Sequence, residues 1–160
     1  MKKLLFIAML ALGFSTVNAQ EGSFNVGANL GFATGDVSDA YSLVLDLEAN
    51  YLFDLSDEFS VGPSLSYVTF IPKSDYNDFL EAVSFLPIDA AIRYNASEQF
   101  TIGADLGYAL SLEEDGEGGF NYRPLVGYNV SENIMIQAAY NAITNDGTAS
   151  FFSVGAVFGL

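Results

Sequence analysis

The side chains in this 160-residue sequence that could take part in chemistry are almost all acids. The chain has 20 Asp and Glu, five Lys and Arg, no histidine and no cysteine. Histidine is the commonest general base and transition-metal ligand, and cysteine supplies thiolates and disulfides. Asp89 and Asp105 could in principle share acid–base work, but nothing in their spacing singles them out. We therefore expect a protein that is not an enzyme and that uses no cofactor or metal.

Six charged residues lie within segments that have the pattern of strands, on the face that we assign below to the inside of a barrel. These residues are Asp46, Glu48, Asp89, Arg93, Asp105 and Arg123. A charge in a low-dielectric lumen must be paired and hydrogen-bonded, because isolated buried charge is very costly. We expect a salt-bridged polar network that plugs the lumen. The alternative is a narrow polar or ion-selective passage lined by the same groups.

A second set of acids lies close together in one predicted loop, at Glu113, Glu114, Asp115 and Glu117. Carboxylates of this kind could contact Ca²⁺ or Mg²⁺, although their spacing does not match an EF-hand. Solvated loop acids are the simpler interpretation. The formal charge of the chain is −15, and Lys73, Arg93 and Arg123 are its only cations after residue 19. Such a chain would repel nucleic acid, whose binding needs Lys and Arg on the phosphates.

The elements that must position these residues follow a period of two. In the first, Phe24, Val26, Ala28, Leu30 and Phe32 alternate with small or polar residues. Eight segments show this alternation, at 24–32, 43–53, 59–67, 86–94, 100–108, 120–128, 134–141 and 152–160. Alternation over about ten residues is typical of a tilted strand that crosses a membrane.

The connections between these segments are of two kinds. The connections 53–59, 94–100 and 128–134 share one template: an aromatic, Asp or Asn, an apolar residue, Ser, an acid, a polar residue and an apolar residue. Asn, Asp and Ser favour tight turns through side-chain hydrogen bonds to the backbone, so we expect three equivalent turns on one rim. The connections 34–41, 71–83, 111–119 and 144–150 are longer. The eight segments and their two kinds of connection together predict an all-β, eight-stranded antiparallel up-and-down transmembrane barrel.

The apolar set is too large for the inside of such a barrel. It amounts to ~40 side chains, whereas an eight-stranded barrel has an interior only just wide enough for side chains to fill. Aromatic residues also gather near the strand ends, as in membrane-interface girdles. We therefore expect the apolar face to meet lipid. The alternative is a soluble lipocalin-like ligand-binding barrel with its apolar set inside. Pro63, Pro87 and Pro124 interrupt the pattern and predict bulges or strand starts.

The first 19 residues have the pattern of a secretory signal peptide. Lys2 and Lys3 precede an apolar run, and small residues precede a Val17-Asn18-Ala19 site. The apolar run is too short to span a bilayer as a helix. We therefore expect a cleaved signal peptide at 1–19 and one barrel domain at 20–160.

The segments 86–94, 102–108 and 153–160 carry a resemblance to known proteins. In them the chain resembles the OmpX/OmpA-type barrels, and especially the outer membrane protein β-barrel domain proteins of Bacteroidetes-like bacteria. The resemblance implies a monomer in the bacterial outer membrane with a structural or surface-interaction role. It also implies contacts with outer-membrane lipids and, through the C-terminal strand, with the barrel-assembly machinery. Such families usually end on an aromatic residue, whereas this chain ends on Leu160, with Phe158 two positions earlier.

One rival to a plugged barrel belongs to the same group of folds. An OmpW-like transport barrel, or a narrow channel for small molecules, would need a wider lumen or a lateral opening. The strand prolines are where we expect such an opening.

Overall fold

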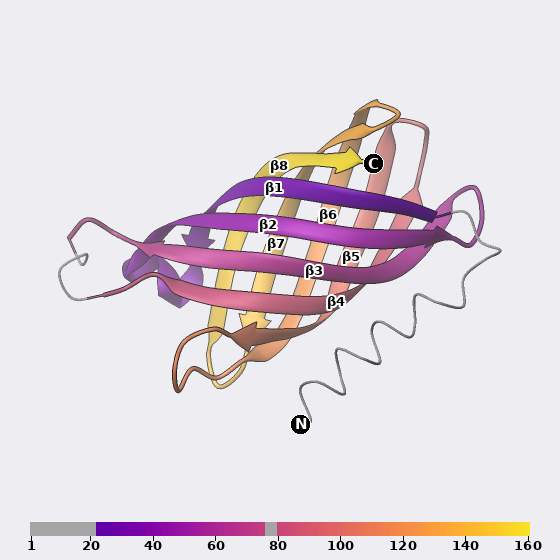
Figure 1. Ribbon diagram of the computed structural model, residues 1–160. Coiled ribbons are helices and arrows are strands. Elements are labelled where there is room, and N and C mark those ends of the chain that lie inside the picture. The colour runs from indigo at the N-terminus through magenta and orange to yellow at the C-terminus, as the bar shows by residue number, and fades with distance from the viewer. Residues whose placement is uncertain (1–21, 76–79) are drawn as a thin grey trace, which may run out of the picture.

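Eight antiparallel strands form a closed barrel in the computed structural model, which describes residues 22–75 and 80–160 (Figure 1). The strands are β1 (Gly22–Thr34), β2 (Tyr41–Asp54), β3 (Phe59–Pro72), β4 (Val83–Asn95), β5 (Phe100–Ser111), β6 (Gly119–Ser131), β7 (Ile134–Thr144) and β8 (Thr148–Gly159). Each pairs with its neighbour in the chain, and β1 pairs with β8 from Asn25↔Gly159 to Thr34↔Ser150. The predicted eight-stranded up-and-down barrel is confirmed. The predicted signal peptide at 1–19 lies outside the described residues.

Closure of the barrel gives the backbone groups of every strand hydrogen-bond partners on both sides. A closed barrel has no free strand edge, so its N–H and C=O groups pair within the sheet as a lipid environment requires. Within the described ranges, no helix has the length and apolar character needed to cross a membrane. A short 3-10 helix, η2 (Gly35–Asp39), links β1 to β2.

The barrel has two different ends. Turns of a few residues join β2 to β3, β4 to β5 and β6 to β7 at what we call the short-turn end, where β1 begins and β8 finishes (Figure 1). The other connections and η2 lie at the opposite end, which we call the loop end. The connection between β7 and β8, at 145–147, has only three residues, so the prediction that it is longer than the short turns was wrong. In outer-membrane barrels short turns face the periplasm and longer loops face outward.

Two of the three short turns follow the expected template. The hydroxyl of Ser56 accepts a hydrogen bond from the backbone N–H of Phe59 at 3.1 Å, and that of Ser97 accepts one from Phe100 at 3.1 Å. The third turn differs, so the prediction of three equivalent turns was wrong. β6 continues to Ser131, and the β6–β7 register shifts between Asn129 and Ser131. The extra residue is taken up in the strand, which leaves a tighter connection of two residues at 132–133.

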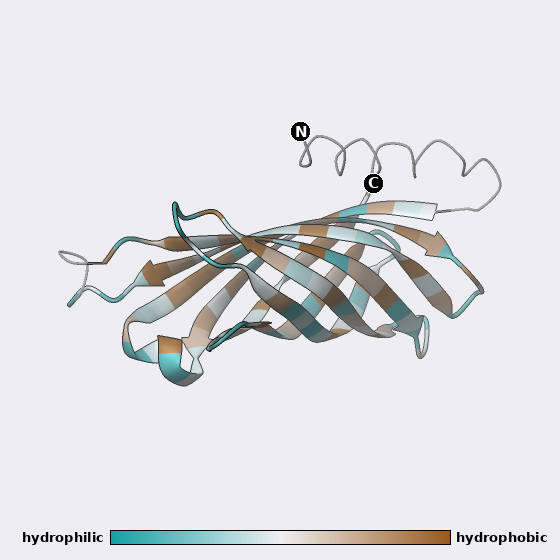
Figure 2. Ribbon diagram, turned by 90° about the horizontal axis from the view of Figure 1, so that it is seen from below, coloured by the Kyte–Doolittle hydropathy of each residue, from teal (hydrophilic) through white to brown (hydrophobic). Residues whose placement is uncertain are grey.

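The apolar set lies on the outer face, as predicted. Leu30 is 56% exposed and Phe32 61%, whereas Asn29 on the same strand, β1, is 4% exposed. Val154 and Ser153 show the same contrast on β8, at 58% and 3%. Hydrophobic and hydrophilic bands alternate along the strands in Figure 2. The lipocalin-like alternative, which needs the apolar set inside, was therefore wrong.

The strand prolines neither cause a bulge nor start a strand, which corrects our expectation. Pro63, Pro87 and Pro124 pair in register with Ala90, Ala109 and Ala104 of one neighbouring strand. Toward the other neighbour, the pairing skips two positions and resumes in the same register, as between Tyr122↔Ala142 and Leu125↔Ala139. Proline lacks the donor for one rung of the ladder, but its φ is compatible with a strand. The prolines therefore remove hydrogen bonds without changing the register.

Candidate functional site

The inside of the barrel is divided into three layers along its axis. At the loop end, an apolar cap consists of Ala33, Val44, Val68, Phe70 and Phe151. In the middle, a charged layer contains the six predicted ionisable residues together with Asn29, Asn121 and Gln137. At the short-turn end there is a polar cavity, the vestibule, of about 220 Å³.

Arg123 is the centre of the charged layer. It lies on β6 and is 2% exposed. Its Nη1 donates to Glu48 Oε2 and, at 3.0 Å, to Asp105 Oδ2, while Nη2 lies 3.6 Å from Asp46 Oδ2. β6 and β2, which carries Glu48, are four strands apart in either direction around the barrel. The ion pair between Arg123 and Glu48 therefore crosses the whole lumen.

Asp105 joins the second arginine to the first. Its Oδ1 accepts a hydrogen bond from Arg93 Nη1 at 2.5 Å, and its Oδ2 accepts the one from Arg123. Arg93 Nη1 also donates to the backbone oxygen of Ile92 at 3.0 Å. Arg93 lies opposite Gly103, where an added Cβ would come within 2.7 Å of the arginine Cδ. A glycine is needed there to leave room for the long side chain.

Amide side chains complete the network. Asn29 donates to Asp46 Oδ2 at 3.2 Å, and Gln137 donates to Asn29 Oδ1 at 3.0 Å and to Glu48. Asp89 accepts a hydrogen bond at 2.7 Å from Asn121 on β6. The structure thus brings five of the six predicted charges into one network of ion pairs, whereas Asp89 is held by an amide.

We did not single out these three amides from the sequence. Asn29, Asn121 and Gln137 stand at inward positions of the period-two pattern, which was the only available signal. An amide both donates and accepts hydrogen bonds. Amide side chains at inward positions close to the inward charges can therefore hydrogen-bond to those charges.

The apolar cap closes the lumen above the charged layer. The rings of Phe70 and Phe151 meet edge to face, with centroids 5.5 Å apart and planes at 89°. Tyr41, Phe85 and Val37 of η2 pack against this cap. Phe70 is 2% exposed and Phe151 0%. The period-two pattern did not predict this layer.

The predicted loop acids do not converge on a common point. Glu113 accepts a hydrogen bond from the backbone N–H of Ser84 at 3.1 Å, and Glu117 accepts one from Asn145 at 3.3 Å. Asp115 has a positive φ of 66°, as expected in a turn, and Glu114 is exposed. In the ranges 22–75 and 80–160, no group of three acids is placed to hold a metal ion. These contacts attach the loop to neighbouring strands.

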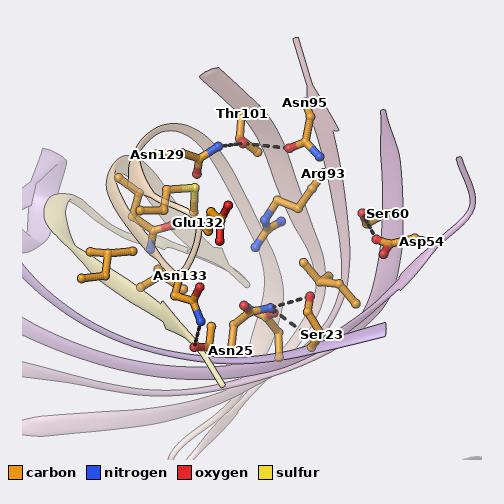
Figure 3. A pocket seen from close by; sticks show the side chains of 17 residues that line it. Ser23, Asn25, Asp54, Ser60, Arg93, Asn95, Thr101, Asn129, Glu132 and Asn133 are labelled. Carbon is orange, nitrogen blue, oxygen red and sulfur yellow. Dashed lines mark hydrogen bonds between the residues drawn. The ribbon is translucent and has the colours of Figure 1, made fainter. Parts of the chain in front are cut away.

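The vestibule is the open part of the lumen. Figure 3 shows a ring of polar side chains around it, with Arg93 reaching into the middle from β4. Five asparagines line it, at Asn25, Asn50, Asn95, Asn129 and Asn133, and Asp54 and Glu132 are the acids in its wall. Leu52, Ile134, Met135 and Val157 form an apolar part of the lining.

A closed barrel with an apolar outer face, a paired polar interior and two unlike rims defines a bacterial outer-membrane β-barrel protein. The chain belongs to the family described as outer membrane protein beta-barrel domain, which it matches over residues 4–159. It is therefore a protein of the bacterial outer membrane that crosses the bilayer with its strands.

Solved structures show the same fold at low sequence identity. The attachment invasion locus protein Ail of Yersinia pestis is 16% identical, with a TM-score of 0.60 over 88% of this chain and 99% of that one. The N-terminal β-barrel domain of Pseudomonas aeruginosa OprF is 14% identical, with a TM-score of 0.58 over 89% of this chain and 100% of that one. A de novo designed transmembrane β-barrel is 14% identical, with a TM-score of 0.57 over 89% of this chain and 100% of that one. No curated protein sequence matches the chain.

Proposed function

We propose that this protein is a non-conducting outer-membrane barrel with a structural role, whose acidic loops are available for interactions at the cell surface. The observation that carries the proposal is that two independent layers cross the lumen. The Arg123–Glu48 pair joins opposite walls, and the Phe70–Phe151 pair closes the barrel above it. An ion would have to disrupt a buried ion-pair network and then pass an apolar seal, both of which are unfavourable.

The charge of the loop end supports a choice of partner. Its connections contain acids in every loop, including Asp36, Asp75, Glu113 and Asp146, and a single cation, Lys73. Ail has been solved in complex with the heparin analogue sucrose octasulfate. Like charges repel, so the loops of this chain would disfavour such a polyanion, and we infer a cationic partner surface instead.

The remaining parts of the proposal concern assembly. We propose that residues 1–19 are removed as a signal peptide, that residues 20–160 insert as a monomer, and that the C-terminal strand contacts the barrel-assembly machinery. Phe158 on β8 is 44% exposed on the lipid face and is the aromatic residue nearest the end. A source among Bacteroidetes-like bacteria remains a prediction from the resemblance alone.

Conductance of the purified barrel in a planar lipid bilayer tests the sealed lumen. We expect no discrete openings from the wild type. The double variant Phe70→Ala with Phe151→Ala opens the cap, and adding Glu48→Gln with Arg123→Gln removes the cross-lumen ion pair as well. We expect openings only from the fourfold variant. Phe152→Ala is the matched control, because Phe152 lies next to Phe151 but on the lipid face, 49% exposed.

Openings from the wild type would overturn the proposal and favour the transport or narrow-channel alternative. In that case Arg93→Ala would change the ion selectivity, since Arg93 belongs to the charged layer and also lines the vestibule.

A further inference from the structure

The vestibule combines the features of a small binding site. It is a cavity of about 220 Å³ that opens at the short-turn end and is closed beneath by the charged layer. Sites for drug-sized ligands enclose roughly 300–1,000 Å³, so a ligand here would be smaller. Its lining contains a charged side chain, Arg93, that is 4% exposed and yet extends into the cavity (Figure 3). The vestibule is therefore a built pocket and not a gap between turns.

The wall of the vestibule offers both donors and acceptors. Asn50 accepts a hydrogen bond from Asn25 at 3.0 Å, and Asn95 accepts one from Thr101 at 2.9 Å. Asn129 donates to the backbone oxygen of Glu98 at 3.1 Å, and Asn133 donates to that of Gly159 at 3.4 Å. Among the described residues, these bonds leave the NH₂ groups of Asn50 and Asn95 and the carbonyl oxygens of Asn129 and Asn133 without a partner. A ligand whose groups both donate and accept would complement them.

The charges around the vestibule exclude other kinds of ligand. Asp54 and Glu132 stand in its wall, and the three short turns contain acids and no Lys or Arg. The charged layer beneath holds four carboxylates against two arginines. An anion would meet this excess of negative charge, whereas a small cation would meet the guanidinium of Arg93 at the centre. A neutral ligand avoids both penalties.

The closed sheet argues against a peptide. Extended peptides are commonly bound by adding a strand to a free sheet edge. The barrel has no such edge, because β1 and β8 pair along their length. A compact ring that carries hydroxyl groups can instead use the amides around the wall and place its C–H groups against Leu52, Met135 and Val157.

We propose that the vestibule is a binding site, accessible from the periplasm, for a neutral saccharide unit of about one ring. Asn50 and Asn129 lie on β2 and β6, on opposite walls, and hydrogen-bond its hydroxyl groups. Arg93 forms the floor. The proposal goes beyond a sealed lumen and does not depend on conductance, because the wall amides would be present in a leaky barrel too.

Titration followed by NMR of side-chain amides tests the site. The probes are glucose and N-acetylglucosamine, and the barrel is held in phosphocholine detergent, since maltoside and glucoside detergents would compete. We expect saturable shifts at Asn50 and Asn129 with a Kd on the order of 1–10 mM, and none at Asn145 at the loop end. Glucuronate has the same ring with a carboxylate, and we expect it to bind roughly tenfold more weakly because of like-charge repulsion.

Two variants and a control assign the contacts. Asn50→Ala and Asn129→Ala should each weaken glucose binding about three- to tenfold through the loss of neutral hydrogen bonds. Asn145→Ala, which removes an amide at the opposite end, should leave binding unchanged. Unboiled mobility equal to that of the wild type establishes that each variant is folded. No saturable shift in the wild type, equal binding of glucuronate, or unchanged binding in both wall variants would each overturn the proposal.

Discussion

Replacing Arg123 by methionine keeps much of the side-chain volume and removes the charge at the centre of the lumen. Three carboxylates then lose their shared partner: Glu48, Asp105 and Asp46. All three side chains are 1% exposed or less, so water cannot replace the guanidinium without a rearrangement. Breaking a buried ion pair by removing one partner costs about 3–5 kcal/mol. We expect a loss at the upper part of this range, because one residue compensates three acids.

Arg93→Met is the matched comparison. Arg93 has one ion pair, to Asp105, and Asp105 keeps its hydrogen bond from Arg123 when Arg93 is removed. The loss is then close to that of a single hydrogen bond to a charged group, about 1.5–3 kcal/mol. The expected order of destabilisation is therefore Arg123→Met well above Arg93→Met.

Urea unfolding in lipid vesicles measures both, with the folded fraction read from the difference in mobility between unboiled and boiled samples. Glu48→Gln placed in the Arg123→Met background should recover part of the loss, because it removes one of the orphaned charges. Equal stability of the two arginine variants would refute a network centred on Arg123. So would a double variant of Arg123→Met and Glu48→Gln whose loss of stability equals the sum of the two single losses.

Two further outcomes follow from the packing and the turns. Phe70→Ala should lower the free energy of unfolding by about 3–5 kcal/mol in the same urea assay, because it leaves a cavity in the apolar cap. Phe152→Ala on the lipid face should cost clearly less. Similar losses from the two variants would mean that the cap is loosely packed. Ser56→Ala should cost about 0.5–1.5 kcal/mol, because it removes the hydroxyl that accepts a hydrogen bond from the N–H of Phe59. Ser131→Ala should cost less, because the hydrogen bond that its hydroxyl accepts from the Asn133 N–H is longer, at 3.4 Å. The reverse order in urea midpoints would contradict the turn geometry.

The strands and their inward charges were predictable because both follow from period two. Along β5, Phe100, Ile102 and Leu106 alternate with Thr101, Gly103 and Asp105, and the structure places the first set outward and the second inward. A charge at an inward position must find a partner, so the presence of a network around Asp105 could be expected without knowing its geometry.

The partners across the lumen were not predictable from local pattern. Gln137 donates to Asn29, 108 residues away, and this contact depends on how far neighbouring strands are staggered around the barrel. The apolar cap was missed for a different reason. Val44 stands between Leu43 and Leu45, and Phe151 stands beside Phe152, so period two is hidden where both faces are apolar.

The prolines and the third turn depart from what local residue types predict. Pro87 was expected to mark a bulge or a strand start. A proline that loses one rung of the ladder can nevertheless stay in register within a strand when its other neighbour pairs normally. The turn at 132–133 shares its residue template with the other two, yet the bulge at the end of β6 shortens it. Turn sequence alone does not fix how many residues the strands absorb.

Accessibility of a single cysteine from each side of the membrane tests the sealed lumen most directly. The native chain has no cysteine, so Asn95→Cys places one thiol in the vestibule wall. The measurement is the rate at which a membrane-impermeant maleimide labels this thiol in vesicles of known barrel orientation. We predict labelling only when the reagent is on the side of the short turns. Labelling at a comparable rate from the side of the loops would mean that the lumen is open, and would contradict the account.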